Sequence, residues 1–323
     1  MRILVVDLLG GLGDLLMVLP AVHALAERRP GAELTLLTRA PGAVLVARDP
    51  AVAAVRVAEE HGERAAVRAA LAATAPDLAV TTTRFDGIGD LLDDDAARRG
   101  TRAVSNLWRG PPPDELVGRR YLALLAAEGV VDPVEATRPR PPRVVLDDDE
   151  RAAGRADLAR YVDAGTGPGP VVLVPDAGMA VKRWPASRWA ALAGRLGAEG
   201  PVLAVTPVDG ARTLDPVDLR RLAARFAAVA DAGGVVVGPD TGPVRLAAAA
   251  GARTVALFGP TLATRYGLEE GTNLQGFPGC PHRRPTAITE QVCWWDAGCP
   301  LSTTGPACLE DLPVAWVLAA VRG

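Results

Sequence analysis

The stretch from Val235 to Thr261, VVVGPDTGPVRLAAAAGARTVALFGPT, constrains the fold of this chain more than any other. It begins with three valines and ends in a second apolar run, and between them lie a turn rich in Gly and Pro and a helix of small residues. Short apolar runs on either side of a helix are typical of buried parallel strands. The stretch therefore predicts one β-α-β unit, with strands at Val235–Val237 and Thr254–Phe258 and a helix at Pro243–Ala250.

The start of the predicted helix carries chemistry as well as shape. Asp240 and Thr241 have side chains that cap helices, and we expect their oxygens to cap this one. The amides of Thr241 and Gly242 would point outward at the positive end of the helix dipole, where phosphate groups bind. Gly242 also lacks a Cβ that would keep a ligand away. The turn is therefore either a phosphate site or an ordinary capped helix of an α/β sheet.

The whole stretch resembles the DTGxxHLAAAxGxPxVALFGPT signature of the heptosyltransferase family of glycosyltransferases. Members of that family move heptose from ADP-heptose during assembly of the lipopolysaccharide core. The resemblance implies that Asp240, Thr241, Gly242 and Pro243 bind the nucleotide-sugar donor. Where the family has His, this chain has Arg245, which could contact a phosphate or a sugar hydroxyl. That change leaves the identity of the donor open.

Length and composition indicate a two-domain α/β protein. The chain has 323 residues, enough for two domains of about 150 residues each. Hydrophobic residues make up 49% of the chain but aromatic residues only 4%, so the cores must be built from Ala, Val and Leu. A net charge of -3 without a basic block argues against nucleic acid as the main partner.

The N-terminal apolar run does not have the features of a membrane or export segment. Asp7 and Asp14 interrupt it, so it does not reach the roughly 18 residues that a transmembrane helix needs. Arg2 leads directly into a strand, and no small-residue cleavage site follows. We therefore expect a cytoplasmic protein without a transmembrane segment.

A glycine-rich loop follows the first predicted strand, Arg2–Leu8, and precedes a helix from Leu15 to about 28. Its three glycines, Gly10, Gly11 and Gly13, permit unusual backbone angles and close approach of a ligand. A dinucleotide site of the Rossmann type fits poorly, because the G-x-G-x-x-G spacing is incomplete.

The resemblance offers a better account of this loop, since the family has a Gly-Asp pair at the same place. It implies that the loop holds the acceptor and that Asp14 is the general base for the acceptor hydroxyl. A carboxylate at a helix N-terminus can accept the proton of a sugar alcohol as the glycosidic bond forms. Asp14 could instead merely cap the helix.

Lys182 is the only lysine among 35 basic residues, in the sequence Lys-Arg-Trp-Pro. A lysine that stands against such a bias indicates a position that needs a compact ammonium rather than a planar guanidinium. The segment matches the K-x-W-P of the same family, which implies that Lys182 contacts donor phosphate, with Arg183 beside it. A departing nucleoside diphosphate gains negative charge, which an ammonium stabilises most in the transition state. After the next strand the family often has an acidic residue that binds the donor ribose, and the resemblance makes Asp209 the candidate for that role.

A proline-rich segment, Thr137–Arg143, is the best domain boundary. It divides the chain into residues 1–142 and 143–323. The resemblance implies that the first part is a Rossmann-like acceptor domain and the second a Rossmann-like nucleotide-sugar domain with a cysteine-containing C-terminal segment. A helix from about 148 to 163 and a loop at Gly165–Gly169 follow the boundary.

A long irregular region near the C-terminus contains all the cysteines. Their spacing, C-x12-C-x5-C-x8-C, lacks the paired C-x-x-C of a zinc site. Persistent disulfides are rare in cytosolic proteins, which leaves free thiols or a structural metal or cluster. We expect Trp294, Trp295 and Trp316 to pack this region. The possible structural site comprises Cys280, Cys293, Cys299 and Cys308.

The resemblance implies a GT-B architecture, with two Rossmann-like domains facing each other across a cleft. It also implies an inverting transfer by a single displacement, in which Lys182 and the amides of Thr241 and Gly242 hold the departing diphosphate. Because these groups supply the positive charge, no catalytic metal or other cofactor is required. Asp93–Asp95 reads as a cluster at a helix end rather than a metal-binding loop.

The substrate and two other functions stay open at this point. The donor would be ADP-heptose or another nucleotide sugar, and the acceptor a lipopolysaccharide core, a cell-wall glycan or other lipid-linked carbohydrate, or a natural product. A nucleotide-sugar epimerase or a non-catalytic nucleotide-sugar binding protein could use the same architecture. Asp14 and Lys182 together favour a transferase.

Overall fold

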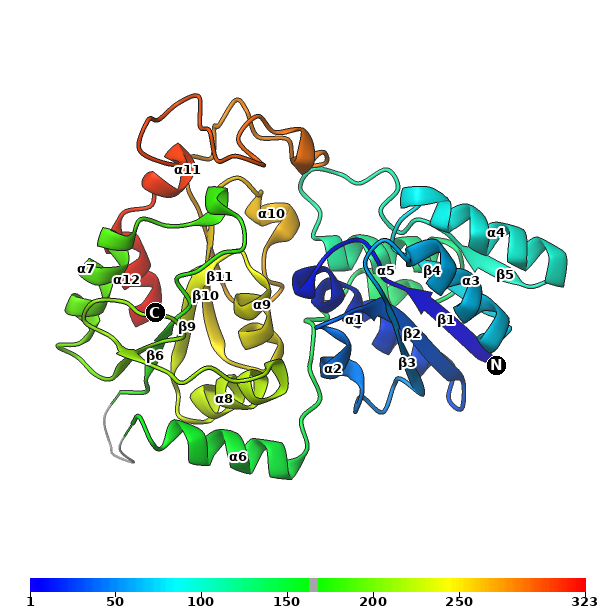
Figure 1. Ribbon diagram of the computed structural model, residues 1–323, viewed down its shortest axis with the longest axis horizontal. Helices are drawn as coiled ribbons and strands as arrows, with labels where there is room; N and C mark the ends of the chain where they lie inside the picture. Colours follow the sequence, from blue (N-terminus) through cyan, green and yellow to red (C-terminus); the bar gives the residue numbers. More distant parts are fainter. Residues whose placement is uncertain (163–167) are drawn as a thin grey trace. The chain divides into compact units, whose positions relative to one another are not determined.

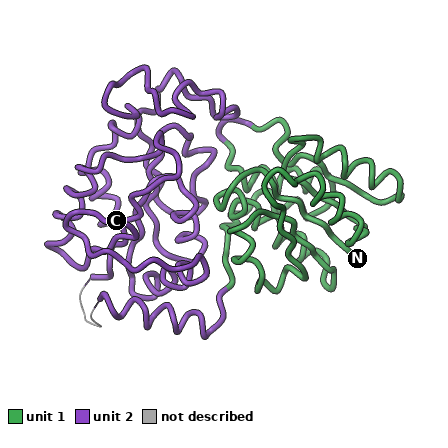
Figure 2. Tube along the Cα trace, in the orientation of Figure 1, with its two compact units in different colours: residues 1–111, 115–145 green, residues 112–114, 146–323 purple. Residues whose placement is uncertain are grey.

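The computed structural model describes residues 1–162 and 168–323. The chain forms two compact units, the first made of residues 1–111 and 115–145 and the second of residues 112–114 and 146–323 (Figure 2). The proline-rich segment Thr137–Arg143 lies at the end of the first unit. Most of the expected loop Gly165–Gly169 lies outside the described residues.

The first unit is a five-stranded parallel sheet with the strand order β3-β2-β1-β4-β5 (Figure 1). Its central strand, RILVV, is apolar almost throughout because neighbouring elements cover both faces of the sheet. The register places Ile3 opposite both Leu34 and Leu78. The strands are β1 (Arg2–Val6), β2 (Glu33–Arg39), β3 (Ala54–Ala58), β4 (Leu78–Thr81) and β5 (Arg102–Val104), and the helices are α1 (Leu12–Arg28), α2 (Ala43–Val46), α3 (Glu63–Thr74), α4 (Ile88–Arg99) and α5 (Val117–Ala127).

Helix α1 begins at Leu12, earlier than the expected start at Leu15. Gly11 is its N-cap, with an extended backbone and no side-chain cap. Asp14 therefore lies inside the first turn and does not precede the helix. The prediction placed the start too late because Gly11 and Gly13 lie beside and inside the first turn, and glycine usually indicates a loop.

The second unit is a six-stranded parallel sheet with the order β11-β10-β9-β6-β7-β8. One face carries a core in which Trp184 and Trp189 pack with apolar residues of α7 and α12. The strands are β6 (Val171–Leu173), β7 (Val202–Ala204), β8 (Arg212–Thr213), β9 (Val235–Pro239), β10 (Arg253–Phe258) and β11 (Thr272–Gln275), and the helices are α6 (Asp148–Leu158), α7 (Ala186–Leu196), α8 (Leu219–Asp231), α9 (Gly242–Ala249), α10 (Ala263–Tyr266), α11 (Ala307–Glu310) and α12 (Val314–Arg322).

The predicted β-α-β unit is confirmed as β9, α9 and β10, with β9 paired to both β6 and β10. Val237 lies opposite Leu173 on one side and Val255 on the other. A Cβ on Gly238 would clash with the Val244 side chain and the Val174 carbonyl, so a glycine here lets α9 pack close to the sheet. This packing fixes the position of the turn that joins β9 to α9.

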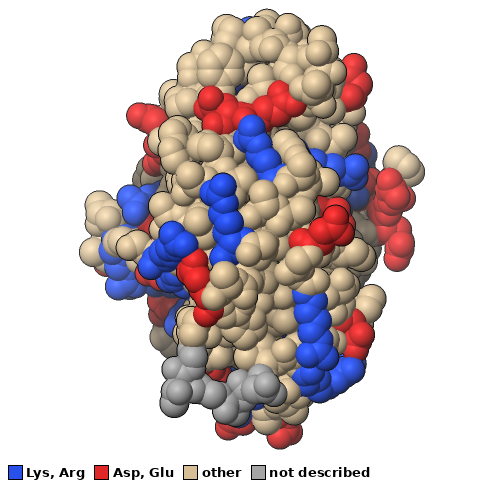
Figure 3. Space-filling view, turned by 90° about the vertical axis from the view of Figure 1, so that its left-hand side faces the viewer, with Lys and Arg blue, Asp and Glu red and all other residues tan. Residues whose placement is uncertain are grey.

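Two surface properties bear on the expectations from the sequence. Among the described residues, no helix combines the length and the apolar character needed to span a bilayer. On the face shown in Figure 3, basic side chains are interspersed with acidic and uncharged ones.

Candidate functional site

The turn after β9 holds a buried carboxylate that is bonded to three other side chains. Asp240 Oδ2 lies 3.0 Å from Lys182 Nζ and accepts a hydrogen bond of 2.8 Å from Thr261 Oγ1. The other oxygen, Oδ1, accepts a bond of 2.6 Å from Nη2 of Arg245. Lys182 also donates to the Asp240 carbonyl, at 3.1 Å. One carboxylate thus joins the two cations that the sequence placed in a donor site.

Parallel strand topology explains why these groups meet. The carboxyl ends of β6, β9 and β10 lie at one edge of the sheet, because the three strands are parallel neighbours. Asp240 follows β9 directly, Thr261 follows β10, and Lys182 ends a 3-10 turn, Ala180–Lys182, in the connection after β6. The amide of Asp240 donates to the Leu257 carbonyl at 3.0 Å, which continues the pairing of β9 with β10.

The two cations hold Asp240 in its charged form. Burial alone would raise the pKa of Asp240, since it disfavours the carboxylate. The charges of Lys182 and Arg245, and hydrogen bonds from Lys182 and Thr261, outweigh burial and hold the pKa of Asp240 well below its usual range. The site therefore contains a permanent carboxylate with two cations around it.

The expectation that Asp240 and Thr241 cap α9 was wrong. The Asp240 carboxylate is bonded to the cations, and Thr241 Oγ1 donates to the Pro239 carbonyl at 3.2 Å. The N-cap residue, Thr241, makes no side-chain capping bond. Charge complementarity outweighed capping, because a buried carboxylate gains more from two cations than from one amide. The first turn of α9, with Gly242 and Pro243, is therefore left without a side-chain cap.

Arg245 lies mostly inside the protein, with 8% of its surface exposed. Besides Asp240, its Nη2 donates to the carbonyl of Tyr266. Arg245 thus binds the buried carboxylate and the end of α10. A direct contact of Arg245 with the donor stays a prediction.

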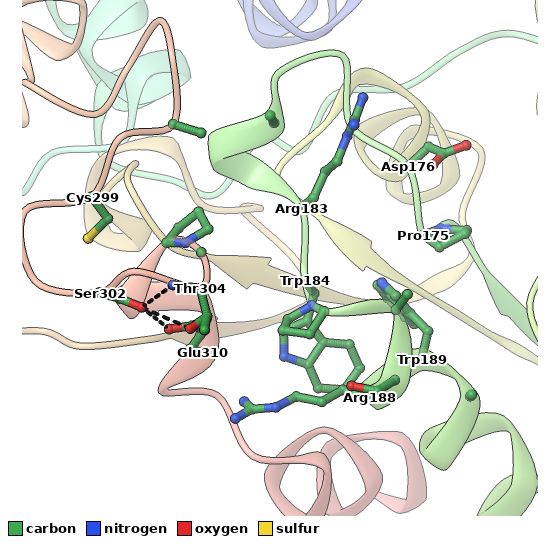
Figure 4. Close-up of a pocket in the computed structure, with 18 of the residues that line it drawn as sticks. Pro175, Asp176, Arg183, Trp184, Arg188, Trp189, Cys299, Ser302, Thr304 and Glu310 are labelled. Carbon is green, nitrogen blue, oxygen red and sulfur yellow. Dashed lines mark hydrogen bonds between the residues drawn. The ribbon is translucent and has the colours of Figure 1, made fainter.

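The remaining donor candidates, Arg183 and Asp209, line an open hollow of about 1210 Å³ in the second unit. Figure 4 shows this hollow with Arg183. Arg183 Nε donates to the Ala177 carbonyl at 3.2 Å, and its side chain is exposed. Lys182 and Gly242 are not among the described residues that line this hollow. The sequence candidates for donor binding are thus divided between the Asp240 cluster and the hollow.

In the first unit, Asp14 lies directly against the glycine loop. A Cβ on Gly10 would overlap Asp14 Oδ2, whereas a Cβ on Gly11 would have no heavy atom within 4 Å. Gly10, Gly11 and Gly13 are not among the described glycines with positive φ, so the expected unusual backbone angles are absent from these three positions. The glycine at position 10 serves to leave room for the Asp14 carboxylate.

Asp7, directly after β1, is a buried titratable group that the sequence did not single out as a site residue. It is 3% exposed, and its Oδ1 accepts a bond of 3.2 Å from Thr82 Oγ1. Burial and the nearby charge of Asp14 raise the pKa of Asp7 to about 7, against the smaller opposing effects of Thr82 and Arg39. Arg39 is itself paired with Glu63 at 2.7 Å. Asp7 could have been found from the sequence, because an acidic residue at the end of an apolar strand is costly to bury and so indicates a special role.

The cysteine-containing region has four free thiols. Burial raises the pKa of Cys308 to about 12, against a smaller opposing effect of the Arg283 charge. In the part of the chain that the structure describes, no three or more metal-binding side chains are arranged to hold an ion. The structural metal site stays a prediction.

The expectation that three tryptophans pack the cysteine region holds for one of them. Trp295 is 77% exposed and Trp316 is 54% exposed, so neither is a core residue. Trp294 is buried, and its ring centroid lies 5.4 Å from Lys182 Nζ. The sequence did not predict that contact, because 112 residues separate the two side chains in the chain.

Comparison with known sequences gives a family match over more than half of the chain. Residues 94–274 match the profile of glycosyltransferase family 9 (heptosyltransferase). The matched range includes Lys182 and the β9–α9–β10 unit. No significant match was found among curated protein sequences.

Solved structures with similar folds cover almost the whole chain. The structure of a glycosyl transferase family 9 protein from Veillonella parvula has a TM-score of 0.75 and 16% identity, covering 99% of this chain and 96% of its own. E. coli ADP-heptose LPS heptosyltransferase II has a TM-score of 0.67 and 19% identity, covering 100% and 98%. E. coli heptosyltransferase WaaC with ADP has a TM-score of 0.61 and 17% identity, covering 91% and 97%. These likenesses show that the fold is of the GT-B type.

Asp7 predicts a pH-dependent stability. Its pKa is raised in the folded protein from 3.8 to about 7, so folding favours the protonated form. The stabilisation is complete below about pH 4 and is lost progressively as the pH rises from about 4 through 7. Asp7→Asn should remove this loss and raise the free energy of unfolding at pH 8 by roughly 2–4 kcal/mol over wild type, with little difference at pH 4.

Urea denaturation at pH 4, 6 and 8 would measure this effect. Asp94→Asn, a change at an exposed position of α4, is the matched control and should follow wild type at each pH. A constant difference between Asp7→Asn and wild type across the series would contradict the assignment.

Proposed function

The chain belongs to glycosyltransferase family 9, and we propose that it transfers a heptose or related sugar from an ADP-sugar or similar nucleotide sugar to a hydroxyl group of an acceptor. The observation that carries this proposal is the cluster of Lys182, Asp240, Arg245 and Thr261 beside the uncapped start of α9. It combines an ammonium with a helix N-terminus, the two features that bind phosphate groups.

In the proposed reaction, Lys182 stabilises the leaving group. An ammonium has three N–H donors. Lys182 Nζ donates to the carbonyl oxygen and to Oδ2 of Asp240, which leaves one N–H for a phosphate oxygen. As the bond between the anomeric carbon and the diphosphate breaks, negative charge grows on the diphosphate. Lys182 and the amides of Thr241 and Gly242 would stabilise that charge more in the transition state than in the bound donor.

Asp14 is the proposed general base. Its carboxylate would accept the proton of the acceptor hydroxyl while the hydroxyl oxygen forms the new bond to the anomeric carbon. Attack from the side opposite the departing diphosphate would invert the configuration at that carbon. The acceptor would be a carbohydrate, a lipid-linked glycan or a natural product, held in part by the loop of Gly10, Gly11 and Gly13.

The roles of Asp14 and Lys182 predict two different kinetic defects. Asp14→Ala should lower the transfer rate by about 10²- to 10⁴-fold with ADP affinity unchanged, because the base does not contact the nucleotide. Lys182→Ala should lower the transfer rate and weaken ADP binding by roughly tenfold or more. Transfer assays and calorimetry with ADP measure both. Normal turnover of Asp14→Ala would remove the base assignment, and donor isomerised without acceptor would indicate an epimerase.

A matched pair of glycine substitutions tests the placement of Asp14. Gly10→Ala should lower the transfer rate nearly as far as Asp14→Ala, because the added Cβ would displace the carboxylate. Gly11→Ala should lower the transfer rate much less than Gly10→Ala, since its Cβ meets no protein atom within 4 Å and its backbone is extended. Equal activities of the two variants would show that catalysis does not depend on the position of the Asp14 carboxylate beside Gly10.

The transfer is proposed to need no divalent metal, because Lys182 and helix amides supply positive charge to the diphosphate. Dialysis against EDTA should therefore leave the transfer rate unchanged, and added Mg²⁺ should not raise it. A loss of activity that Mg²⁺ restores would overturn this part of the mechanism.

A further inference from the structure

We propose that Trp294 is a positioning residue for Lys182. The segment that contains the four cysteines, residues 280–308, is thereby part of the donor site. This inference rests on the proposed function, since it assigns Trp294 a role in diphosphate binding through Lys182. The observation behind it is the 5.4 Å separation of Lys182 Nζ from the Trp294 ring centroid, within the range of a cation–π interaction.

The ring and the carboxylate hold the lysine in different ways. Asp240 accepts hydrogen bonds from Nζ, but its negative charge also reduces the attraction that Lys182 offers to a phosphate. The Trp294 ring attracts the ammonium through its quadrupole and carries no net charge. It therefore restricts the flexible side chain, which is 19% exposed, while the positive charge remains available to an anion.

Trp294 is held in place by a network at the base of its segment. Its amide donates to the carbonyl of Gln291 at 3.0 Å, and Gln291 is only 4% exposed. Gln291 Oε1 in turn accepts from the amide of Arg284 at 2.9 Å. The neighbouring Arg283 is buried and donates to the Gly259 carbonyl, after β10, at 2.8 Å from Nη2. The segment is thus anchored to the same edge of the sheet that supplies Asp240.

The segment also forms one wall of the open hollow in the second unit. Cys299 and Ser302 line this hollow together with Arg183, which follows Lys182 in the chain (Figure 4). Two observations therefore join the segment to the lysine loop: the ring contact and the shared lining. The proposal gives the segment a function that does not depend on metal binding by its cysteines.

A double-mutant cycle on ADP binding tests the proposal. Trp294→Leu keeps an apolar side chain but removes the ring, and it should weaken calorimetric binding of ADP by about tenfold. In a Lys182→Met background the same change should have little further effect, because the ring then has no cation to hold. Trp295→Leu, at the exposed neighbouring position, is the matched control and should bind ADP as wild type does.

The outcomes separate the inference from the proposed function. Suppose that wild type binds ADP and that Trp294→Leu weakens ADP binding equally in the wild-type and Lys182→Met backgrounds. Trp294 would then have a general packing role, and the inference would be overturned. Unchanged binding in Trp294→Leu would overturn it too. If circular dichroism shows that Trp294→Leu does not fold, Trp294→Phe takes its place in the same cycle, with a smaller loss expected that also vanishes with Lys182→Met. Wild type that binds no ADP would contradict the proposed function itself.

Discussion

The ion pairs of the buried Asp240 carboxylate are the interaction on which the second unit's site depends. A buried carboxylate is costly unless it is paired, and here Lys182, Arg245 and Thr261 satisfy it. These partners come from the connection after β6, from α9 and from the end of β10. The carboxylate therefore fixes three segments of the sheet edge together, and it keeps an ammonium beside a helix start that no side chain caps.

The first unit also places two carboxyl groups, those of Asp7 and Asp14, near the end of a central strand. Asp14 lies within the first turn of α1, where the absence of a Cβ on Gly10 leaves space for its carboxylate. Behind it, Asp7 is buried at the end of β1 with its pKa raised to about 7 by burial and by the charge of Asp14. The carboxyl edge of this sheet, where parallel sheets bind ligands, thus carries one half-buried carboxylate and one that is readily protonated.

Some residues of the two sites could be predicted from the sequence and others could not. The sequence predicted the β9–α9–β10 unit, because two apolar runs flank a helix of small residues. The two Rossmann-like units were implied by the family resemblance. It singled out Lys182 and Asp240 as donor-site residues but assigned Asp240 to a helix cap. It treated Trp294, Trp295 and Trp316 alike, although only the first is buried against the lysine. Asp7 was noted only as a break in an apolar run.

The sequence by itself determined the order of strands and helices, because periodicity and the turn residues Gly, Pro and Asp act over a few neighbouring positions. The GT-B fold class and most candidate residues came from its resemblance to a known family. The tertiary structure alone decided which charges meet. Asp240 binds partners 58, 5 and 21 residues away in the chain, and Lys182 meets the ring of Trp294. Such contacts depend on which strand ends lie side by side and on how far each group is removed from water, and neither property is local in the sequence.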